Sequence, residues 1–316
     1  MTSIAIEFKA VTKRFSKTDR PAVDAVDLKV HQGETVALIG ASGCGKTTSL
    51  KMINRLIEPT EGSILVNGQD IRSLPLLALR RSLGYVIQHV GLFPHMTVAG
   101  NIAVVPRLLG WDKSRIRKRV DELLEMVQLP PGEFRGRRPF DLSGGQQQRV
   151  GVARALAVDP PILLMDEPFG SLDPITRANL QNQILDIQRK LRKAVVIVTH
   201  DMEEAVRLAD RIVVMQAGKI EMDARPSDIL LKPATPFVAS LLGDSRMIKL
   251  LQTLKVGDHA SSGNCAGAPE LPASASLHDA LNIFLESGAN AIAVRDGSAE
   301  ASCLHRDRLF NIARST

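Results

Sequence analysis

The feature that most constrains the fold of this chain is a glycine-rich segment between an apolar run and a helical pattern. The apolar run is Thr35–Ile39, and the helical pattern is carried by Leu50, Ile53, Leu56 and Ile57. The segment between them consists of Gly40, Ala41, Ser42, Gly43, Cys44, Gly45, Lys46, Thr47 and Thr48. A buried strand, a glycine-rich loop ending in Gly-Lys-Thr and a helix form the context in which a phosphate-binding loop occurs. The sequence therefore predicts a polyphosphate site in an α/β fold.

The chemistry of such a site explains the residue types in the segment. Glycine at Gly40, Gly43 and Gly45 lets the backbone approach a polyphosphate closely and turn its N–H groups inward. The new helix directs its positive end at the same place. We predict that Lys46 neutralises the β- and γ-phosphates and that the Thr47 hydroxyl binds Mg²⁺. The alternative, a glycine-rich turn with an unrelated lysine, leaves the flanking strand and helix unexplained.

Two adjacent carboxylates follow a second apolar run at 162–165. Asp166 and Glu167 would lie at the C-terminal end of a buried strand, where α/β sheets bind ligands. We predict that Asp166 holds Mg²⁺ through water and that Glu167 is the general base toward the attacking water. Neighbouring strand residues point in different directions, so the two acids can take different roles. The alternative is an acidic turn that only ends the strand, and the phosphate loop argues against it.

A third candidate site begins at Ser143, Gly144, Gly145 and Gln146, ahead of a helix with apolar periodicity. Free N–H groups at a helix start form an anion site. Without the two other motifs, a simple N-cap would be the default interpretation.

Hydrophobic patterning predicts how the chain is organised. The opening 30 residues alternate between apolar and polar in short runs, which favours antiparallel strands. From Thr35 onward, buried strands alternate with helices, which indicates a parallel sheet with crossover helices. The candidate strands are 35–39, 84–88, 162–165, 194–199 and 211–215. Between Asn101 and Ala157 the pattern is helical except for a loop at 130–139, so we expect an inserted helical subdomain.

The C-terminal part is predicted to be separate. The stretch 257–276 is rich in Gly, Ser, Ala and Pro, which is typical of a linker or loose loop. One apolar helix face follows, formed by Leu277, Ala280, Leu281, Phe284 and Leu285, and 291–294 is a candidate strand. We therefore expect a nucleotide-binding domain at 1–245, a linker at 246–276 and a small α/β unit at 277–316.

Composition limits the classes of function. No run approaches the ~20 consecutive apolar residues that cross a bilayer, and the N-terminus lacks the basic-then-apolar order of a secretion signal. We expect a cytosolic chain whose membrane role comes through a partner. Much of the net charge of +6 lies in the basic runs 113–119 and 135–138. A basic patch can bind nucleic acid or an anionic membrane surface, but aromatic residues make up only 3% of the chain, so stacking platforms are scarce. We expect no nucleic-acid partner.

The three cysteines are Cys44, Cys265 and Cys303. Their odd number and the absence of metal-ligand spacing fit a reducing compartment and no disulfide framework. Cys44 is either a reactive thiol near a helix N-terminus or a small residue at a variable position, which is the simpler interpretation.

The order of these motifs resembles that of the ATP-binding-cassette (ABC) ATPases. The signature of that family, Leu-Ser-Gly-Gly-Gln, stands here at 142–146, between the phosphate loop and the Asp-Glu-Pro strand. Four further positions match: Gln88 resembles the glutamine loop, Asp173 of Ser171-Leu172-Asp173 the D-loop, His200 the switch histidine, and Phe15 the aromatic that stacks on adenine, with Phe for the commoner Tyr. The resemblance covers 4–245.

The resemblance implies a fold, an activity and a mechanism. The fold is the α/β P-loop ATPase fold, with a mixed-sheet core, an antiparallel β subdomain and an inserted helical subdomain. The implied activity is ATP hydrolysis with Mg²⁺. Two chains would pair head to tail, and each ATP would lie between one chain's phosphate loop and the other's Ser143–Gln146. ATP would close the dimer and hydrolysis would release it.

The same resemblance assigns roles to the matching residues. ATP would be bound by the segment 40–48 together with Phe15 and Gln88. Mg²⁺ would be held by Thr47, Gln88 and Asp166, and Gln88 would link the metal to a transmembrane partner. Catalysis would depend on Lys46, Gln88, Glu167 and His200, with His200 contacting the γ-phosphate.

The segments 51–56, 87–98, 142–156 and 168–174 are similar to the ATPases of osmoprotectant uptake systems, which handle glycine betaine, choline and carnitine. The implied partners are a second ATPase copy, an integral-membrane permease and an extracytoplasmic substrate-binding protein. The implied location is peripheral, on the cytoplasmic face of the bacterial inner membrane. Alternatives are an importer ATPase for another small solute such as an amino acid, a soluble ABC protein of DNA repair or translation, and a nucleotide-binding module without turnover. ABC proteins of DNA repair carry a long inserted coiled coil and those of translation join two cassettes in one chain, and this sequence shows neither feature. Glu167 supplies a carboxylate in the position of the base, which argues against a module without turnover.

The segment 276–309 resembles a single cystathionine-β-synthase (CBS) repeat, which osmoprotectant ATPases often carry as a regulator. Such repeats usually occur in pairs. The adenosine-binding pattern has Ser or Thr three residues before its Asp, whereas Leu304 precedes Asp307, and Ala301 or Ser302 replaces its Gly. A packing or dimer-contact role is therefore favoured over a sensor.

Overall fold

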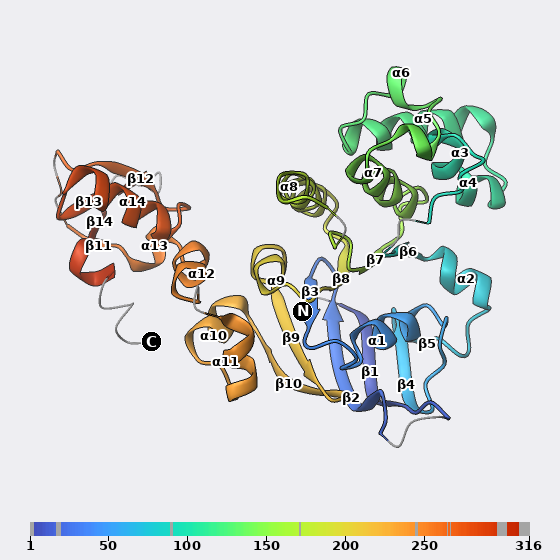
Figure 1. Cartoon of the computed structure of the whole chain (residues 1–316), viewed down its shortest axis with the longest axis horizontal. Helices are drawn as coiled ribbons and strands as arrows, with labels where there is room; N and C mark the ends of the chain where they lie inside the picture. The colour runs from blue at the N-terminus through green and yellow to red at the C-terminus, as the bar shows by residue number, and fades with distance from the viewer. Residues whose placement is uncertain are drawn as a thin grey trace. The chain divides into compact units, whose positions relative to one another are not determined.

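The computed structural model describes residues 3–16, 20–88, 91–170, 172–243, 246–263, 265, 267–295 and 302–309 (Figure 1). Several residues of the predicted motifs, namely His89, Val90, Ser171 and Ala301, lie outside the described residues. The chain forms two compact units, Met1–Asp223 and Ala224–Thr316. No helix in the described parts of the chain has the length and apolarity that crossing a membrane requires.

An antiparallel sheet opens the first unit. It contains β1 (Ile4–Lys13), β2 (Val23–His31), β4 (Glu61–Val66) and β5 (Gln69–Asp70), in the order β2-β1-β4-β5. Phe8 of β1 pairs with Leu28 of β2 and Ile64 of β4, and all three side chains are buried. The antiparallel start predicted from alternation is confirmed, because one face of these strands packs on the core.

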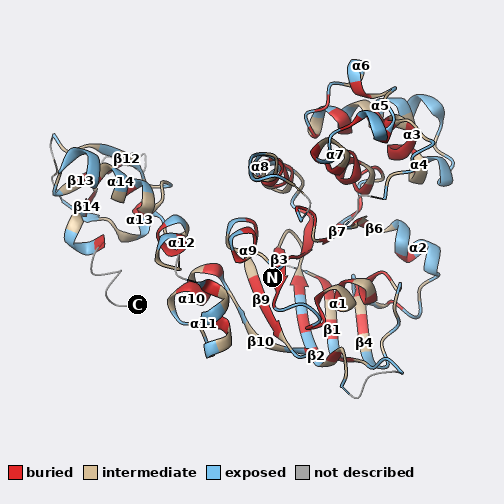
Figure 2. Cartoon of the chain, in the orientation of Figure 1, coloured by how far each residue is buried: buried red, intermediate tan, exposed pale blue. Residues whose placement is uncertain are grey.

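The second sheet contains β10 (Lys219–Ala224), β9 (Arg211–Gln216), β3 (Thr35–Ile39), β8 (Ala194–Val198), β7 (Ile162–Asp166) and β6 (Leu83–Val86), in that spatial order. Neighbouring strands from β9 to β6 are parallel. Every residue of β3, β7 and β8 is buried, as expected for a parallel sheet covered on both faces. Figure 2 shows this burial along the central strands. The predicted parallel sheet is confirmed.

Helices connect the strands of this sheet: α1 (Lys46–Ile53), α2 (Leu76–Arg81), α8 (Pro174–Leu191) and α9 (Met202–Leu208). The predicted continuation of the first helix through Leu56 and Ile57 is wrong. Arg55 adopts a left-handed backbone with φ of 50°, which ends the helix. Leu56 consequently lies outside α1 and is 49% exposed.

A helical subdomain is inserted between β6 and β7. Its elements are α3 (Val98–Ile102), α4 (Val104–Leu108), α5 (Lys113–Met126), α6 (Pro131–Phe134), the 3₁₀ helix η1 (Pro139–Asp141) and α7 (Gly144–Ala155). Figure 1 shows them gathered in one group. Val120 and Leu124 of α5 are buried in one cluster with Val150 of α7. The predicted loop at 130–139 contains the short helix α6, whose first residue is a proline, a favoured residue at that position.

The second unit begins with α10 (Pro226–Leu231), α11 (Pro236–Leu242), α12 (Arg246–Thr253) and α13 (Val256–His259). Arg246 Nε donates to the carbonyl of Leu230 at 2.5 Å, so α12 is tied to the preceding helices. The boundary between the two compact units follows Asp223, and it therefore comes before the expected end of the nucleotide-binding domain at 245. The division into 1–245, 246–276 and 277–316 stays a prediction.

The rest of the second unit is a small α/β layer of β11 (Ser261–Ser262), β12 (Glu270–Pro272), α14 (Leu277–Ser287), β13 (Ala291–Arg295) and β14 (Ser302–His305). The sheet order is β11-β14-β13-β12, with β12 parallel to β13 and β14 antiparallel to it. Phe284 of α14 is buried against Ile292 and Leu304. The interpretation of 257–276 as a linker or loose loop is wrong, because β11, β12 and most of α13 lie within it and both strands pair with the sheet.

Cys265 and Cys303 form a disulfide bond, with their Cα atoms 6.1 Å apart. The expectation of a chain without disulfides is therefore wrong. Cys303 belongs to β14, and β14 pairs with β11, which brings the loop after β11 beside it. The two cysteines are 38 residues apart in the sequence, so only the strand pairing reveals their proximity. Cys44 is free and buried.

Candidate functional site

The glycine-rich loop joins β3 to α1, and its backbone approaches two neighbouring segments very closely. Gly40 and Gly45 have φ of 150° and 109°. A Cβ atom at Gly40 would lie 2.1 Å from the carbonyl oxygen of Met215, and one at Gly45 would lie 2.4 Å from that of Ala22. Both positions therefore require glycine for conformation and for space.

Lys46 at the start of α1 is buried, at 6% exposure. Its Nζ donates to the carbonyls of Gly40 at 2.7 Å and Ala41 at 3.0 Å, and lies 3.7 Å from Cys44 Sγ. The two backbone carbonyls are neutral, so they solvate the ammonium without compensating its charge. A buried charge is stabilised by an opposite one, and a polyphosphate would supply it.

The next residue, Thr47, contacts the first predicted carboxylate. Thr47 Oγ1 donates to Asp166 Oδ1 at 3.0 Å. Burial at the end of β7 raises the pKa of Asp166, and the hydrogen bond from Thr47 opposes that rise. Burial, followed by the charge of Asp166, raises the pKa of Tyr85 to about 12. A hydroxyl and a carboxylate oxygen side by side are hard ligands that suit Mg²⁺.

Glu167 points away from this pair. Its Oε2 accepts a hydrogen bond from Gln88 Nε2 at 2.8 Å and lies 3.6 Å from His200 Nδ1. The Glu167 backbone has φ of 44°, an uncommon conformation for a residue with a side chain. Its N–H donates to the Val198 carbonyl at 2.9 Å, which anchors the strained residue to the end of β8. Strain of this kind is commonly found at functional sites.

One pocket of about 310 Å³ brings these groups together. It is lined by the loop residues 42–48 and by Glu167 and His200. A pocket of this size falls within the range of small-molecule sites, about 300–1,000 Å³. An acid within reach of a histidine and an amide, next to a phosphate-binding loop, can orient and deprotonate a water molecule.

Several of the predicted site residues do not line this pocket, among them those of the signature, Phe15 and Asp173. Ser143 and Gln146 form a capping box at the start of α7. The Ser143 N–H donates to Gln146 Oε1 at 2.9 Å, and the Gln146 N–H donates to Ser143 Oγ at 3.3 Å. Phe15 is 41% exposed, and the Lys13 ammonium lies 5.2 Å from its ring centre. Asp173 caps α8, and its hydrogen bond with Thr176 lowers the pKa of Asp173.

Sequence reasoning missed a layer of side chains behind His200. Thr199 Oγ1 donates to Glu204 Oε2 at 2.6 Å. Arg177 reaches Asp201 at 3.5 Å and Glu204 at 3.8 Å. Burial raises the pKa of Glu204, which is 5% exposed. The helix cap formed by Asp201 was detectable as an acid followed by glutamates in the first helical turn, whereas nothing in the sequence marks the contact of Thr199 with Glu204.

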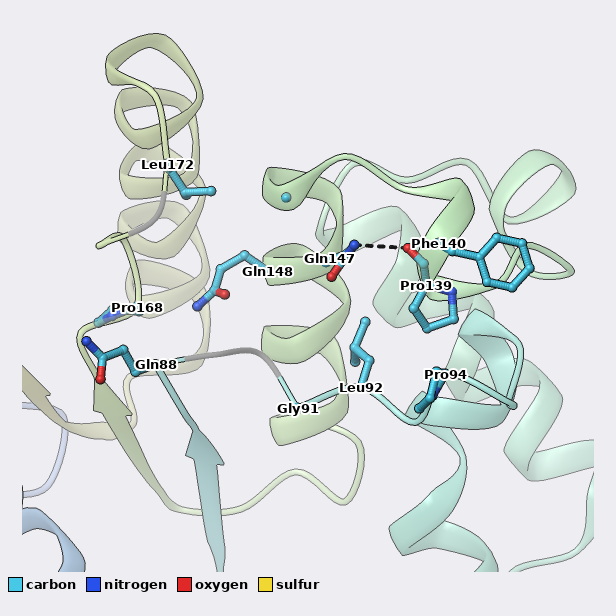
Figure 3. Close-up of a pocket in the computed structure, with 11 residues that line it drawn as sticks. Gln88, Gly91, Leu92, Pro94, Pro139, Phe140, Gln147, Gln148, Pro168 and Leu172 are labelled. Atoms are coloured by element: carbon cyan, nitrogen blue, oxygen red, sulfur yellow. Dashed lines mark hydrogen bonds between the residues drawn. The ribbon is translucent and has the colours of Figure 1, made fainter.

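A groove of about 460 Å³ lies between Gln88 and the helical subdomain. Figure 3 shows Gln88 and Pro168 on one side of it and Leu92, Pro94 and Pro139 on the other. Gln147 of α7 donates to the Pro139 carbonyl at 3.0 Å. Phe140, at the edge of this groove, is 71% exposed. Exposed aromatic rings are typical of surfaces that contact other proteins.

Comparisons with known proteins agree with this geometry. Residues 23–170 match the family described as ABC transporter. The osmoprotectant import ATP-binding protein OsmV of Salmonella typhimurium is 50% identical over 299 residues, 93% of this chain and 77% of that protein. The glycine betaine/carnitine/choline transport ATP-binding protein OpuCA of Bacillus subtilis is 51% identical over 77% of this chain and 64% of that protein. A solved dimeric ATP-binding cassette, MJ0796 bound to ADP and Pi, has a TM-score of 0.63 and 34% identity, over 70% of this chain and 98% of that one.

Proposed function

The chain belongs to the ABC transporter family of ATPases, and we propose that it is the ATP-hydrolysing motor of a bacterial importer for quaternary-amine osmoprotectants. The observation that carries this proposal is one cassette with the phosphate loop, the Asp166–Glu167 pair and His200 in mutual reach. The names of OsmV and OpuCA support the solute class, since both relatives are about half identical to this chain.

For hydrolysis we propose the following roles. Lys46 binds the β- and γ-phosphates, in place of the loop carbonyls that now hold its ammonium. Thr47 and Asp166, with Gln88 nearby, would hold Mg²⁺, which shields phosphate charge when bound. Glu167 accepts the proton of the attacking water. Gln88 and His200 flank the Glu167 carboxylate and orient it.

The complete ATP site is proposed to form between two copies. Ser143–Gln146 lie at the start of α7, with Ser143 as its N-cap, and do not line the phosphate-loop pocket of their own chain. In a head-to-tail dimer, the free N–H groups at the start of α7 would meet the γ-phosphate bound to the other copy. The dimeric state of MJ0796 with ADP and Pi supports this arrangement.

The groove beside Gln88 is proposed to receive a short helix of the permease. The exposed ring of Phe140 and the apolar side chains of Leu92 and Pro94 form an apolar surface on which such a helix could pack. Gln88 lines this groove and also donates a hydrogen bond to Glu167. A permease helix in the groove could therefore change the position of the catalytic carboxylate through Gln88. The motor would then lie peripherally on the cytoplasmic face of the inner membrane. The solute itself would be selected by the permease and a substrate-binding protein.

The C-terminal layer is proposed to be a single CBS-like module. The order β12-α14-β13-β14, with a parallel and an antiparallel neighbour for β13, supports that topology. Leu304 and Cys303 are buried in the module. This burial favours a packing or dimer-contact role over adenosine binding.

Transport assays test the proposal. Vesicles that hold the chain with its co-encoded permease and binding protein should take up radiolabelled glycine betaine, choline or carnitine when ATP is inside. Uptake should be lost in Glu167→Gln. Strong ATP turnover without uptake of any of the three solutes would contradict the assignment to osmoprotectants and would leave the proposal of an importer motor intact. An amino acid would then be the next solute to test.

A further inference from the structure

A pocket on the helical subdomain is separate from both the phosphate-loop pocket and the Gln88 groove. It has a volume of about 470 Å³ and lies between α3, α4 and α5. Its floor is apolar and is formed by Ala99, Ala103, Ile116 and Val120. The two alanines are small and leave room above them, while Val120 and Ala103 are anchored in the buried cluster of the subdomain.

Basic side chains surround this apolar floor. Lys113 and Arg117 follow one another by one turn of α5, on the same face as Ile116 and Val120. Arg107 lines the pocket from α4. None of these three cations pairs with a carboxylate among the described residues, whereas Arg135, the fourth, is bound to Asp121 at 2.5 Å. Three charges without a counter-charge around an apolar hollow favour an anion that carries an aliphatic part.

The chain segment between Arg107 and Trp111, two residues that line the pocket, presents further apolar surface to solvent. Leu108, the last residue of α4, and Leu109 after it are 68% and 37% exposed. Trp111 lines the pocket, and the Arg115 guanidinium stacks on its ring at 3.6 Å. Exposed leucines, a tryptophan and several basic residues together are the composition of segments that lie at the surface of an anionic bilayer.

We propose that this pocket binds an anionic phospholipid of the bilayer, with an acyl chain on the apolar floor and the headgroup among Arg107, Lys113 and Arg117. The site is distinct from the ATP site and from the proposed permease groove. It would fasten the helical subdomain to the membrane surface.

The chemistry of the lining favours a lipid over an acidic peptide. A peptide segment presents backbone N–H groups that need acceptors. The side chains that line the pocket are aliphatic, indole or cationic, and none of them is a carboxylate, an amide or a hydroxyl. The phosphate of an anionic lipid accepts hydrogen bonds from the cationic side chains, and its acyl chain neither donates nor accepts any.

Trp111 allows a direct test, because it is the single tryptophan of the chain. The full chain would be mixed with vesicles of phosphatidylglycerol and phosphatidylcholine, and with vesicles of phosphatidylcholine alone. We expect binding only to the anionic vesicles, and quenching of Trp111 fluorescence when the acyl chains carry bromine. The double variant Arg107→Gln with Arg117→Gln should bind about 25-fold more weakly, since each basic side chain near an anionic surface contributes about fivefold.

The matched control is Arg81→Gln with Lys190→Gln, two exposed basic residues outside the pocket, which should bind vesicles nearly as well as the wild type. Thermal unfolding of each variant checks that it folds. Equal losses in the two double variants, or binding without bromine quenching, would overturn the pocket as the site. A Trp111 response to an acidic peptide without vesicle binding would overturn it in favour of a protein partner. The permease is absent, so the result is independent of the transported solute.

Discussion

The side-chain amide of Gln88 donates a 2.8 Å hydrogen bond to the carboxylate of Glu167, a residue 79 positions further along the chain. Gln88 follows β6 and Glu167 follows β7, and these strands are parallel neighbours, so their carboxyl ends meet. Gln88 also lines the groove proposed for the permease. One side chain therefore touches both the proposed catalytic base and the proposed docking surface.

Replacing the base should stop hydrolysis without preventing nucleotide binding. We expect Glu167→Gln to lower the turnover number by about 10²–10⁴-fold, the usual contribution of a general base. The phosphate contacts of Lys46 remain, so the variant should accumulate as an ATP-bound dimer, which light scattering would detect. Lys46→Ala is the contrasting variant, and it should weaken ATP binding itself. Normal hydrolysis by both variants would show that the site is misassigned.

Gln88 should link the groove to the base. We expect Gln88→Ala to lower ATP turnover about tenfold, because the Glu167 carboxylate loses a charge-assisted hydrogen bond. Gln147→Ala is the matched control. Its side chain lines the same groove but donates to the Pro139 carbonyl, so it should leave turnover of the isolated chain unchanged. Steady-state ATPase rates with and without the permease would separate the two, and equal effects on the isolated chain would contradict the proposed link.

The buried carboxyl of Glu204 should give a pH dependence to stability. Burial raises the pKa of Glu204 above its ordinary value of 4.5. Between the unfolded and the folded pKa, the folded chain binds more protons than the unfolded chain, so the free energy of unfolding falls as pH rises through this window. Glu204→Gln should remove this part of the slope and keep an acceptor for Thr199.

Urea unfolding of the wild type and of Glu204→Gln, at pH values that rise in steps from the ordinary pKa of 4.5, measures the difference in slope. Glu125→Gln, which replaces an exposed acid on α5, is the control and should leave the slope unchanged. Parallel curves for the wild type and Glu204→Gln would contradict the assignment.

The sequence predicts the fold well where a local pattern and its tertiary environment agree. The run Thr35–Ile39 is a strand with the predicted bounds, because an unbroken apolar run fits a sheet covered on both faces. Asp166 and Glu167 point to different partners, as predicted from their adjacency at a strand end. These features depend on periodicity and on motif order, both of which are local.

The features that the sequence did not reveal depend on backbone conformations and side-chain contacts that a hydrophobic pattern does not encode. The left-handed backbone of Glu167 is held by the Val198 carbonyl on the neighbouring strand. The contact of Thr199 with Glu204 joins a strand end to a helix, and the end of α1 is set by the backbone of Arg55 rather than by the apolar pattern. Tertiary interactions of this kind override local propensity.

The disulfide between Cys265 and Cys303 should stabilise the C-terminal unit. The bond spans a sequence separation of 38 residues, and closing a loop of that size restricts the unfolded chain by about 3–4 kcal/mol. We expect a reductant to lower the unfolding free energy of this unit by about that amount, and to leave the transition of the first unit unchanged. Calorimetry with and without reductant would resolve the two transitions.

The matched variant is Cys265→Ala with Cys303→Val, since Cys303 is 1% exposed and needs an apolar replacement. Reductant should have no further effect on this variant, and an equal shift in both proteins would exclude the bond as the cause.

The proposed location on the cytoplasmic face adds a second expectation, because thiols there are kept reduced. Thiol trapping in intact cells should find Cys265 and Cys303 as free thiols. The C-terminal unit would then be at its lower stability during transport, and an oxidised pair in the cell would contradict that location or require an oxidant beside it.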